Sequence, residues 1–94
     1  MNFLFSQQNY NSLFKKKLKN SSNKFTHEIN FKKAKTFFLE KNWDSTLVYS
    51  MKQLSIDKKK SELDYYCYFF RGVSFKEKKI FNEAKNAFNK IKII

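Results

Sequence analysis

The chain has 94 residues, a net charge of +12, 19% aromatic residues, one glycine and no proline. A chain of this length forms one domain at most, and its aromatic content excludes the composition of a disordered protein. Tight turns and sheet corners depend on glycine and proline, so their scarcity favours an all-α fold.

Residues 1–25 are predicted to form a basic amphipathic leader or an extra helix. Tyr10, Phe14 and Leu18 recur at four-residue steps, with lysines between them. The apolar cluster precedes the lysines, which reverses the order found in a secretory signal. The segment has no acidic residue, like a mitochondrial presequence, but it also has no arginine. The compartment stays open: we expect an intracellular protein, with a mitochondrion or another organelle as one candidate.

Residues 26–94 are predicted to form a single helical domain that begins with a helical hairpin. Apolar residues recur at three- and four-residue steps on both sides of Asn42, which is suited to cap the helix that follows it. The two stripes contain Ile29, Ala34, Phe37 and Phe38 before Asn42, and Trp43, Leu47, Met51 and Leu54 after it. This spacing predicts two antiparallel helices joined by a short loop.

A second hairpin follows. Ser61 and Asp64 form a capping-box pattern, a hydroxyl three residues before a carboxylate, at the start of an apolar run. Apolar and small residues then repeat at helical intervals on both sides of the lysine-rich turn at 76–79. They are Tyr65, Tyr68, Phe69, Gly72 and Phe75, followed by Phe81, Ala84, Phe88 and Ile91. No segment shows the alternation of a strand.

Residues 65–94 resemble the tetratricopeptide repeat, a helix–turn–helix unit of about 34 residues. The likeness rests on the order of aromatic and small residues: Tyr68, Gly72, Phe75, Phe81, Ala84, Phe88 and Ile91. The resemblance implies that Gly72 and Ala84 let the two helices approach, while the aromatic residues fill the space where the helices diverge. Two departures are Arg71, where the family usually has leucine, and the absence of a closing proline.

A less complete copy covers residues 27–54. Its matching positions are Ala34, Phe37 and Trp43, while Thr46 and Ser50 replace an expected alanine and a large core residue. The spacing between the two copies exceeds the family period by about four residues. Together the copies predict antiparallel helical hairpins stacked as a short tetratricopeptide-like solenoid with an N-terminal leader helix. A generic helical bundle is the alternative.

An enzyme is not expected. One histidine, one cysteine and one glycine leave few groups for a catalytic dyad, a metal site or a phosphate-binding loop. Cys67 lies within an aromatic run and is expected to be buried. The sequence therefore predicts no cofactor, metal or small-molecule substrate. No stretch approaches the length of a transmembrane helix.

Two repeat units are fewer than the roughly three that a stable stack normally needs. We therefore expect a non-catalytic protein–protein interaction or assembly subunit of a larger complex. The resemblance implies a partner groove lined by the first helix of each unit, with Phe31, Lys35, Phe38, Tyr66, Phe69 and Val73 as candidates. Phe31, Phe69 and Val73 stand where a carboxylate-binding set would need polar or basic residues, so we expect an apolar groove for a helix or loop. Packing of the same aromatic side chains against the leader helix, within one chain, is the alternative.

The charge supports a second hypothesis, a basic structural protein of a ribonucleoprotein particle such as an organellar ribosome. The candidate phosphate contacts are Lys15, Lys16, Lys17, Lys58, Lys59 and Lys60. Arg71 is the only arginine, although arginine is the residue best suited to bidentate phosphate contacts. A third and weaker hypothesis is a peripheral membrane contact through the leader.

Overall fold

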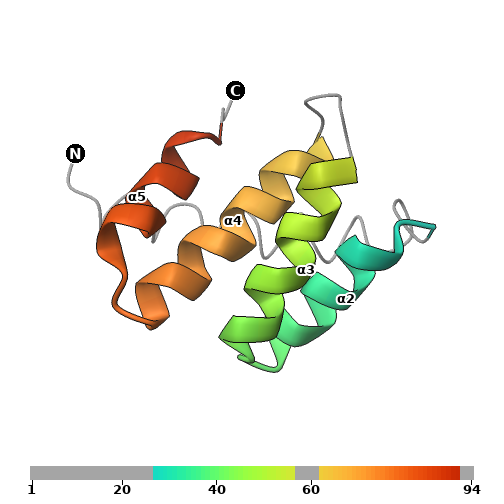
Figure 1. Cartoon of the computed structure of the whole chain (residues 1–94), viewed down its shortest axis with the longest axis horizontal. Helices are drawn as coiled ribbons and strands as arrows, with labels where there is room; N and C mark the ends of the chain where they lie inside the picture. The colour runs from blue at the N-terminus through green and yellow to red at the C-terminus, as the bar shows by residue number, and fades with distance from the viewer. Residues whose placement is uncertain (1–26, 57–61, 92–94) are drawn as a thin grey trace.

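Four α-helices make up the part of the chain that the computed structural model describes, residues 27–56 and 62–91. They are α2 (Ile29–Leu39), α3 (Trp43–Ile56), α4 (Glu62–Glu77) and α5 (Phe81–Asn89) (Figure 1), and these residues contain no strand. The predicted all-α fold is confirmed over these ranges. The leader, Ser61 and the six candidate phosphate-binding lysines lie outside the described residues.

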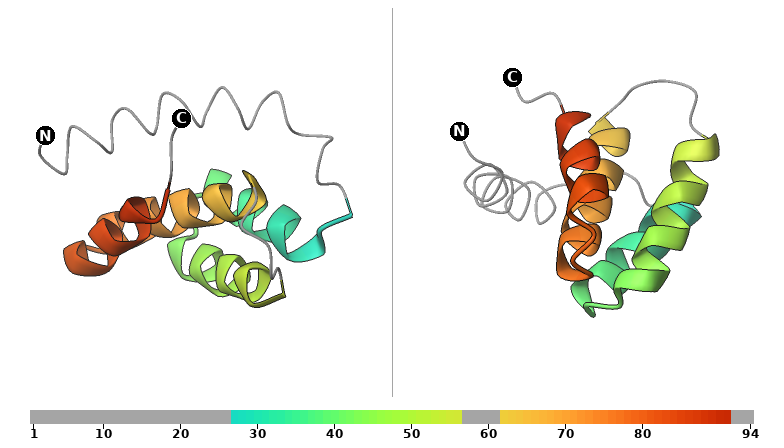
Figure 2. Two further views of the ribbon diagram at one scale, coloured as in Figure 1. Left: turned by 90° about the horizontal axis from the view of Figure 1, so that it is seen from above. Right: turned by 60° about the vertical axis from the view of Figure 1, so that its left-hand side comes forward.

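The helices form two hairpins that lie against one another. Helices α2 and α3 form the first hairpin and α4 and α5 the second, while α4 also packs against both α3 and α2 (Figures 1 and 2). Nine of the 16 residues of α4 are buried, because this helix contacts all three others. Aromatic rings fill the junction between the hairpins: Phe38 lies 4.7 Å from Phe70 and 5.5 Å from Phe69, between ring centroids.

The two hairpin turns share one backbone geometry. At the end of α2, the N–H of Lys41 donates to the carbonyl of Phe38 and the N–H of Asn42 to that of Phe37. At the end of α4, Lys79 donates to Lys76 and Ile80 to Phe75 in the same pattern. This is the Schellman motif, and it places Lys41 and Lys79 in the left-handed region with φ of 60° and 63°. Lysine occupies the position that glycine usually takes.

The two helices of the first hairpin are capped differently, one by a neighbour in sequence and the other by a residue of the partner helix. Asn42 accepts a hydrogen bond from the backbone N–H of Ser45 through its side-chain oxygen at 3.2 Å, so the predicted cap of α3 is confirmed. Helix α2 receives no such bond from its own N-cap residue, Glu28. Instead, Oε1 of Gln53 accepts from the N–H of Phe31 at 3.1 Å, and Nε2 of Gln53 donates to Glu28. A residue of α3 therefore satisfies one of the backbone donors at the start of α2 that have no partner within the helix.

The two hairpins are related by a shift of 38 residues. The turn residues Lys41 and Lys79, both at positive φ, differ by this number, and so do the first residues of α3 and α5. All five buried residues of the first hairpin fall on buried residues of the second: Phe31 on Phe69, Ala34 on Gly72, Thr46 on Ala84, Ser50 on Phe88 and Gln53 on Ile91. The same positions therefore point inward in both hairpins. The last three are polar in the first hairpin and apolar in the second.

Candidate functional site

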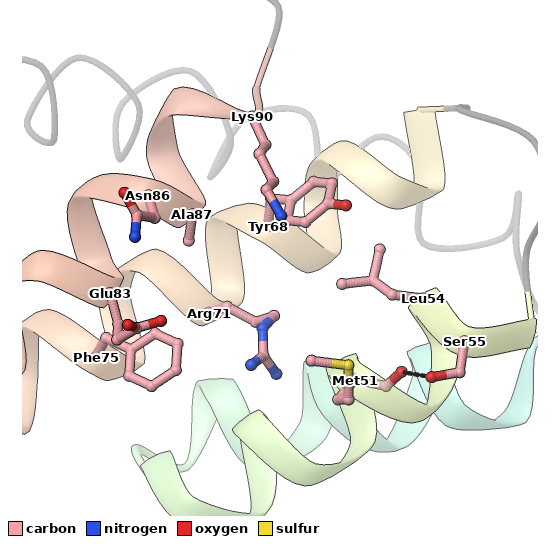
Figure 3. A pocket seen from close by; sticks show the side chains of 10 residues that line it. All are labelled: Met51, Leu54, Ser55, Tyr68, Arg71, Phe75, Glu83, Asn86, Ala87 and Lys90. Atoms are coloured by element: carbon pink, nitrogen blue, oxygen red, sulfur yellow. Dashed lines mark hydrogen bonds between the residues drawn. The ribbon is translucent and has the colours of Figure 1, made fainter.

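A pocket of about 290 Å³ lies where α3, α4 and α5 meet, on the side away from α2 (Figure 3). Each helix contributes side chains at three- or four-residue steps, because that spacing places residues on one helix face. The lining residues are Met51, Leu54 and Ser55 from α3, Tyr68, Arg71 and Phe75 from α4, Glu83, Asn86 and Ala87 from α5, and Lys90, the C-cap residue of α5.

Arg71 crosses this pocket from α4 and reaches α3. Its Nη1 donates to the backbone carbonyl of Leu47 at 2.7 Å and lies 3.3 Å from Oγ of Ser50. The guanidinium group also lies over the ring of Phe75, 5.2 Å from the centroid. Ser50 is fully buried, and its hydroxyl also donates to Leu47. The arginine therefore ties the second hairpin to the first through a polar contact inside the interface.

The pocket lining has two cationic side chains, Arg71 and Lys90, and one acidic side chain, Glu83. Desolvation lowers the pKa of Arg71 from its usual value, and the nearby Cys67, Tyr68 and Glu83 raise it in part. Burial is also the main cause that raises the pKa of the Tyr68 phenol above 10.0, and Asp64 and Cys67 add to the effect. Lys90 lies over the Tyr68 ring, 5.3 Å from its centroid, in a cation–π contact.

The described residues offer little for metal chemistry. Among them there is no group of three or more histidine, cysteine, aspartate or glutamate side chains that could hold a metal ion. Cys67 is fully buried, as predicted. The described helices also include none with the length and apolar character to cross a membrane.

Most of the predicted partner-groove residues lie in the core. Phe31, Tyr66, Phe69 and Val73 are buried with exposed fractions of 4, 0, 1 and 7%, while Lys35 and Phe38 are partly buried. Four of the six side chains therefore do not form an open groove in this structure. Tyr66 and Phe31 contact one another, with ring centroids 5.9 Å apart. These four side chains belong to the core of the described helices. Packing against the leader concerns residues outside the described part of the chain, and binding of a partner stays a prediction.

The predicted helix-packing residues are divided between the core and the surface. Ala34, Gly72, Ala84 and Phe88 are buried, and Trp43, Tyr68 and Phe75 are partly buried. Phe81 differs: it begins α5 with 53% of its surface exposed. Helical spacing places Phe81 on the same face as Ala84 and Phe88, but it does not determine whether another element covers that end of the face.

Sequence reasoning did not find the pocket. Its residues come from three helices and are separated by as many as 39 positions, from Met51 to Lys90, so no local motif joins them. One signal was present in the sequence: Arg71 departs from the apolar residue expected at its position. A charged residue in the middle of an apolar helix indicates a polar partner on a neighbouring element.

Comparisons with known proteins add no family to this description. No protein-family model matches the chain, and searches of curated proteins and of solved structures gave no significant match.

Proposed function

We propose that this chain is a non-catalytic protein–protein interaction subunit of a larger assembly, built as a short tetratricopeptide-like stack. The observation that carries the proposal is the 38-residue shift in residue number, which matches the two Schellman turns and all five buried positions of the first hairpin with those of the second. Small residues lie at the sites where the repeat brings helices together, Ala34 and Gly72 in the first helices of the units.

Two stacked units bury less apolar surface per residue than a longer stack, which supports association with another protein. Large apolar side chains remain exposed on the described residues, with Ile29 at 66%, Leu39 at 65% and Ile56 at 63%. Single exposed apolar residues are common on any protein, so the main support for the proposal is the repeat pattern and not these residues.

A second candidate, a ribonucleoprotein component, is supported by one feature of the first hairpin. The ammonium groups of Lys33 and Lys52 both lie over the ring of Tyr49, at 5.2 and 4.9 Å from its centroid. Tyr49 in turn stacks on Phe37 with the ring planes 13° apart. Aromatic rings among lysines are typical of proteins that bind single-stranded nucleic acid.

Size-exclusion chromatography of the native protein from its own cells, with and without RNase, tests both candidates. We expect a large complex that survives RNase and high salt, with defined protein partners identified in it by mass spectrometry. A complex that collapses on RNase treatment would support the ribonucleoprotein candidate, because phosphate contacts depend steeply on salt and on the RNA itself. A chain that elutes alone would refute both.

A further inference from the structure

The donors of Arg71 are only partly used within the protein. A guanidinium group carries five N–H donors in a planar fork. Only Nη1 is engaged, by Leu47 and Ser50, and the donors on Nε and Nη2 have no acceptor in the part of the chain that the structure describes. Within that part, no carboxylate forms an ion pair with Arg71. A partly buried arginine therefore brings unpaired donors to a pocket.

The surroundings of Arg71 favour a negatively charged group. Its guanidinium group lies in the middle of the pocket between Phe75 and Met51 (Figure 3), and Lys90 extends over Tyr68 along the same wall. The single acid of the lining, Glu83, leaves an excess of one positive charge among these side chains. Partial desolvation strengthens the attraction of Arg71 for an anion, since water no longer screens the charge fully.

The remaining wall is apolar. Met51, 48% exposed, and Leu54 approach from α3, and Ala87 lies opposite on α5. We propose that the pocket binds a protein segment that carries an aspartate or glutamate beside an apolar residue. Arg71 and Lys90 bind the carboxylate, and Met51, Leu54 and Phe75 contact the apolar side chain. This inference rests on the proposed function and names the partner chemistry that it uses.

A protein segment fits these residues better than an RNA strand. Arginine forms two parallel hydrogen bonds with a carboxylate, and the free donors on Nε and Nη2 have the fork geometry that this requires. An RNA backbone needs a track of several cations, whereas here Glu83 lies on the same surface as the two cations. A pocket of about 290 Å³ accommodates one or two side chains and not a nucleotide chain.

Two matched libraries of short peptides test the proposal with the intact chain. One library has a central glutamate or aspartate among randomised apolar positions, and the other has glutamine or asparagine at the centre. We expect the acidic library to bind at least about tenfold more tightly than the amide library, because a charge-assisted bidentate pair replaces a neutral hydrogen bond. Chemical-shift changes at the side-chain amide of Asn86 would place the bound peptide in the pocket. A uridine oligonucleotide is the competing probe.

Variants of α5 separate the pocket from general charge attraction. Lys90→Glu reverses a lining charge at the C-cap of α5, and Lys85→Glu reverses the charge of an exposed lysine within α5 that does not line the pocket. We expect Lys90→Glu to remove most of the preference for acidic peptides and Lys85→Glu to leave it largely in place. Arg71→Lys, checked for folding by circular dichroism, should also lose the preference because lysine has no fork.

Three results would overturn the proposal. Both libraries could bind equally, or Lys85→Glu could reduce the preference for acidic peptides as much as Lys90→Glu does. The third is an oligonucleotide that binds more tightly than the acidic peptides and shifts the Asn86 amide signals. The proposed function can survive such a failure. A chain that shows no peptide preference but still elutes with its protein assembly would refute the pocket alone.

Discussion

Gly72 in α4 lies directly against the ring of Phe88 in α5. A Cβ atom built on Gly72 would lie 2.5 Å from Cε1 and 2.7 Å from Cδ1 of Phe88, closer than real Cβ contacts. The glycine φ is not positive, so the missing side chain is required by the approach of the helices and not by the backbone conformation. Because Phe88 is 3% exposed, its ring has little room to withdraw.

Replacing Gly72 by alanine should lower the stability of the protein. The added methyl group overpacks the helix contact at a cost of about 1–3 kcal/mol, while better helix propensity returns about 1 kcal/mol. We expect a net loss, measured by urea unfolding. The double variant Gly72→Ala/Phe88→Leu should cost less than the two single changes together, because the smaller side chain makes room. A rise in stability with Gly72→Ala alone would contradict the close contact.

Removing the distant cap on α2 should weaken the first hairpin. In Gln53→Leu, the N–H of Phe31 loses its acceptor and Glu28 its donor, which should cost about 1–3 kcal/mol in the free energy of unfolding. Hydrogen exchange at the Phe31 amide should rise more than elsewhere in α2. Ser55→Ala is the matched control, since its hydroxyl bonds only to Met51 of its own helix. Equal losses in both variants would argue against the cap.

The raised pKa of Tyr68 predicts a loss of stability at alkaline pH. Burial favours the neutral phenol in the folded chain, so its pKa there exceeds the 10.0 of the unfolded chain. Below pH 10 both states keep the proton; above it the unfolded state ionises first, and the free energy of unfolding falls. In Tyr68→Phe this alkaline fall should be shallower. Urea unfolding at a series of pH values measures it, and identical profiles would refute the assignment.

The ion pair between the second hairpin turn and the start of α3 should contribute little. Lys78 donates to Asp44, whose side chain is 80% exposed, so water and salt screen the attraction. We expect Lys78→Ala to change the free energy of unfolding by about 0–1 kcal/mol and the difference to shrink in high salt. A loss comparable to that of Gln53→Leu would show that the contact between Lys78 and Asp44 is a principal link between the hairpins.

The sequence by itself determined the positions of the helices. Periodic apolar residues and Asn42 define α2 and α3 within a few residues, because helical spacing and capping involve neighbours along the chain. The small residues Ala34, Gly72 and Ala84 were expected as helix contact sites from the resemblance to the repeat, and all three are buried. The aromatic spacing did not reveal that Phe81 is exposed, since spacing fixes a helix face but not what lies opposite it.

Only the tertiary structure decided the partners of the polar residues and the shape of the pocket. Gln53 caps a helix that begins more than 20 positions earlier, and Arg71 bonds to a carbonyl in another hairpin. Such contacts depend on how far each helix is rotated and translated against its neighbours. Packing of side chains across the whole chain sets that arrangement, so no local pattern of residues contains it.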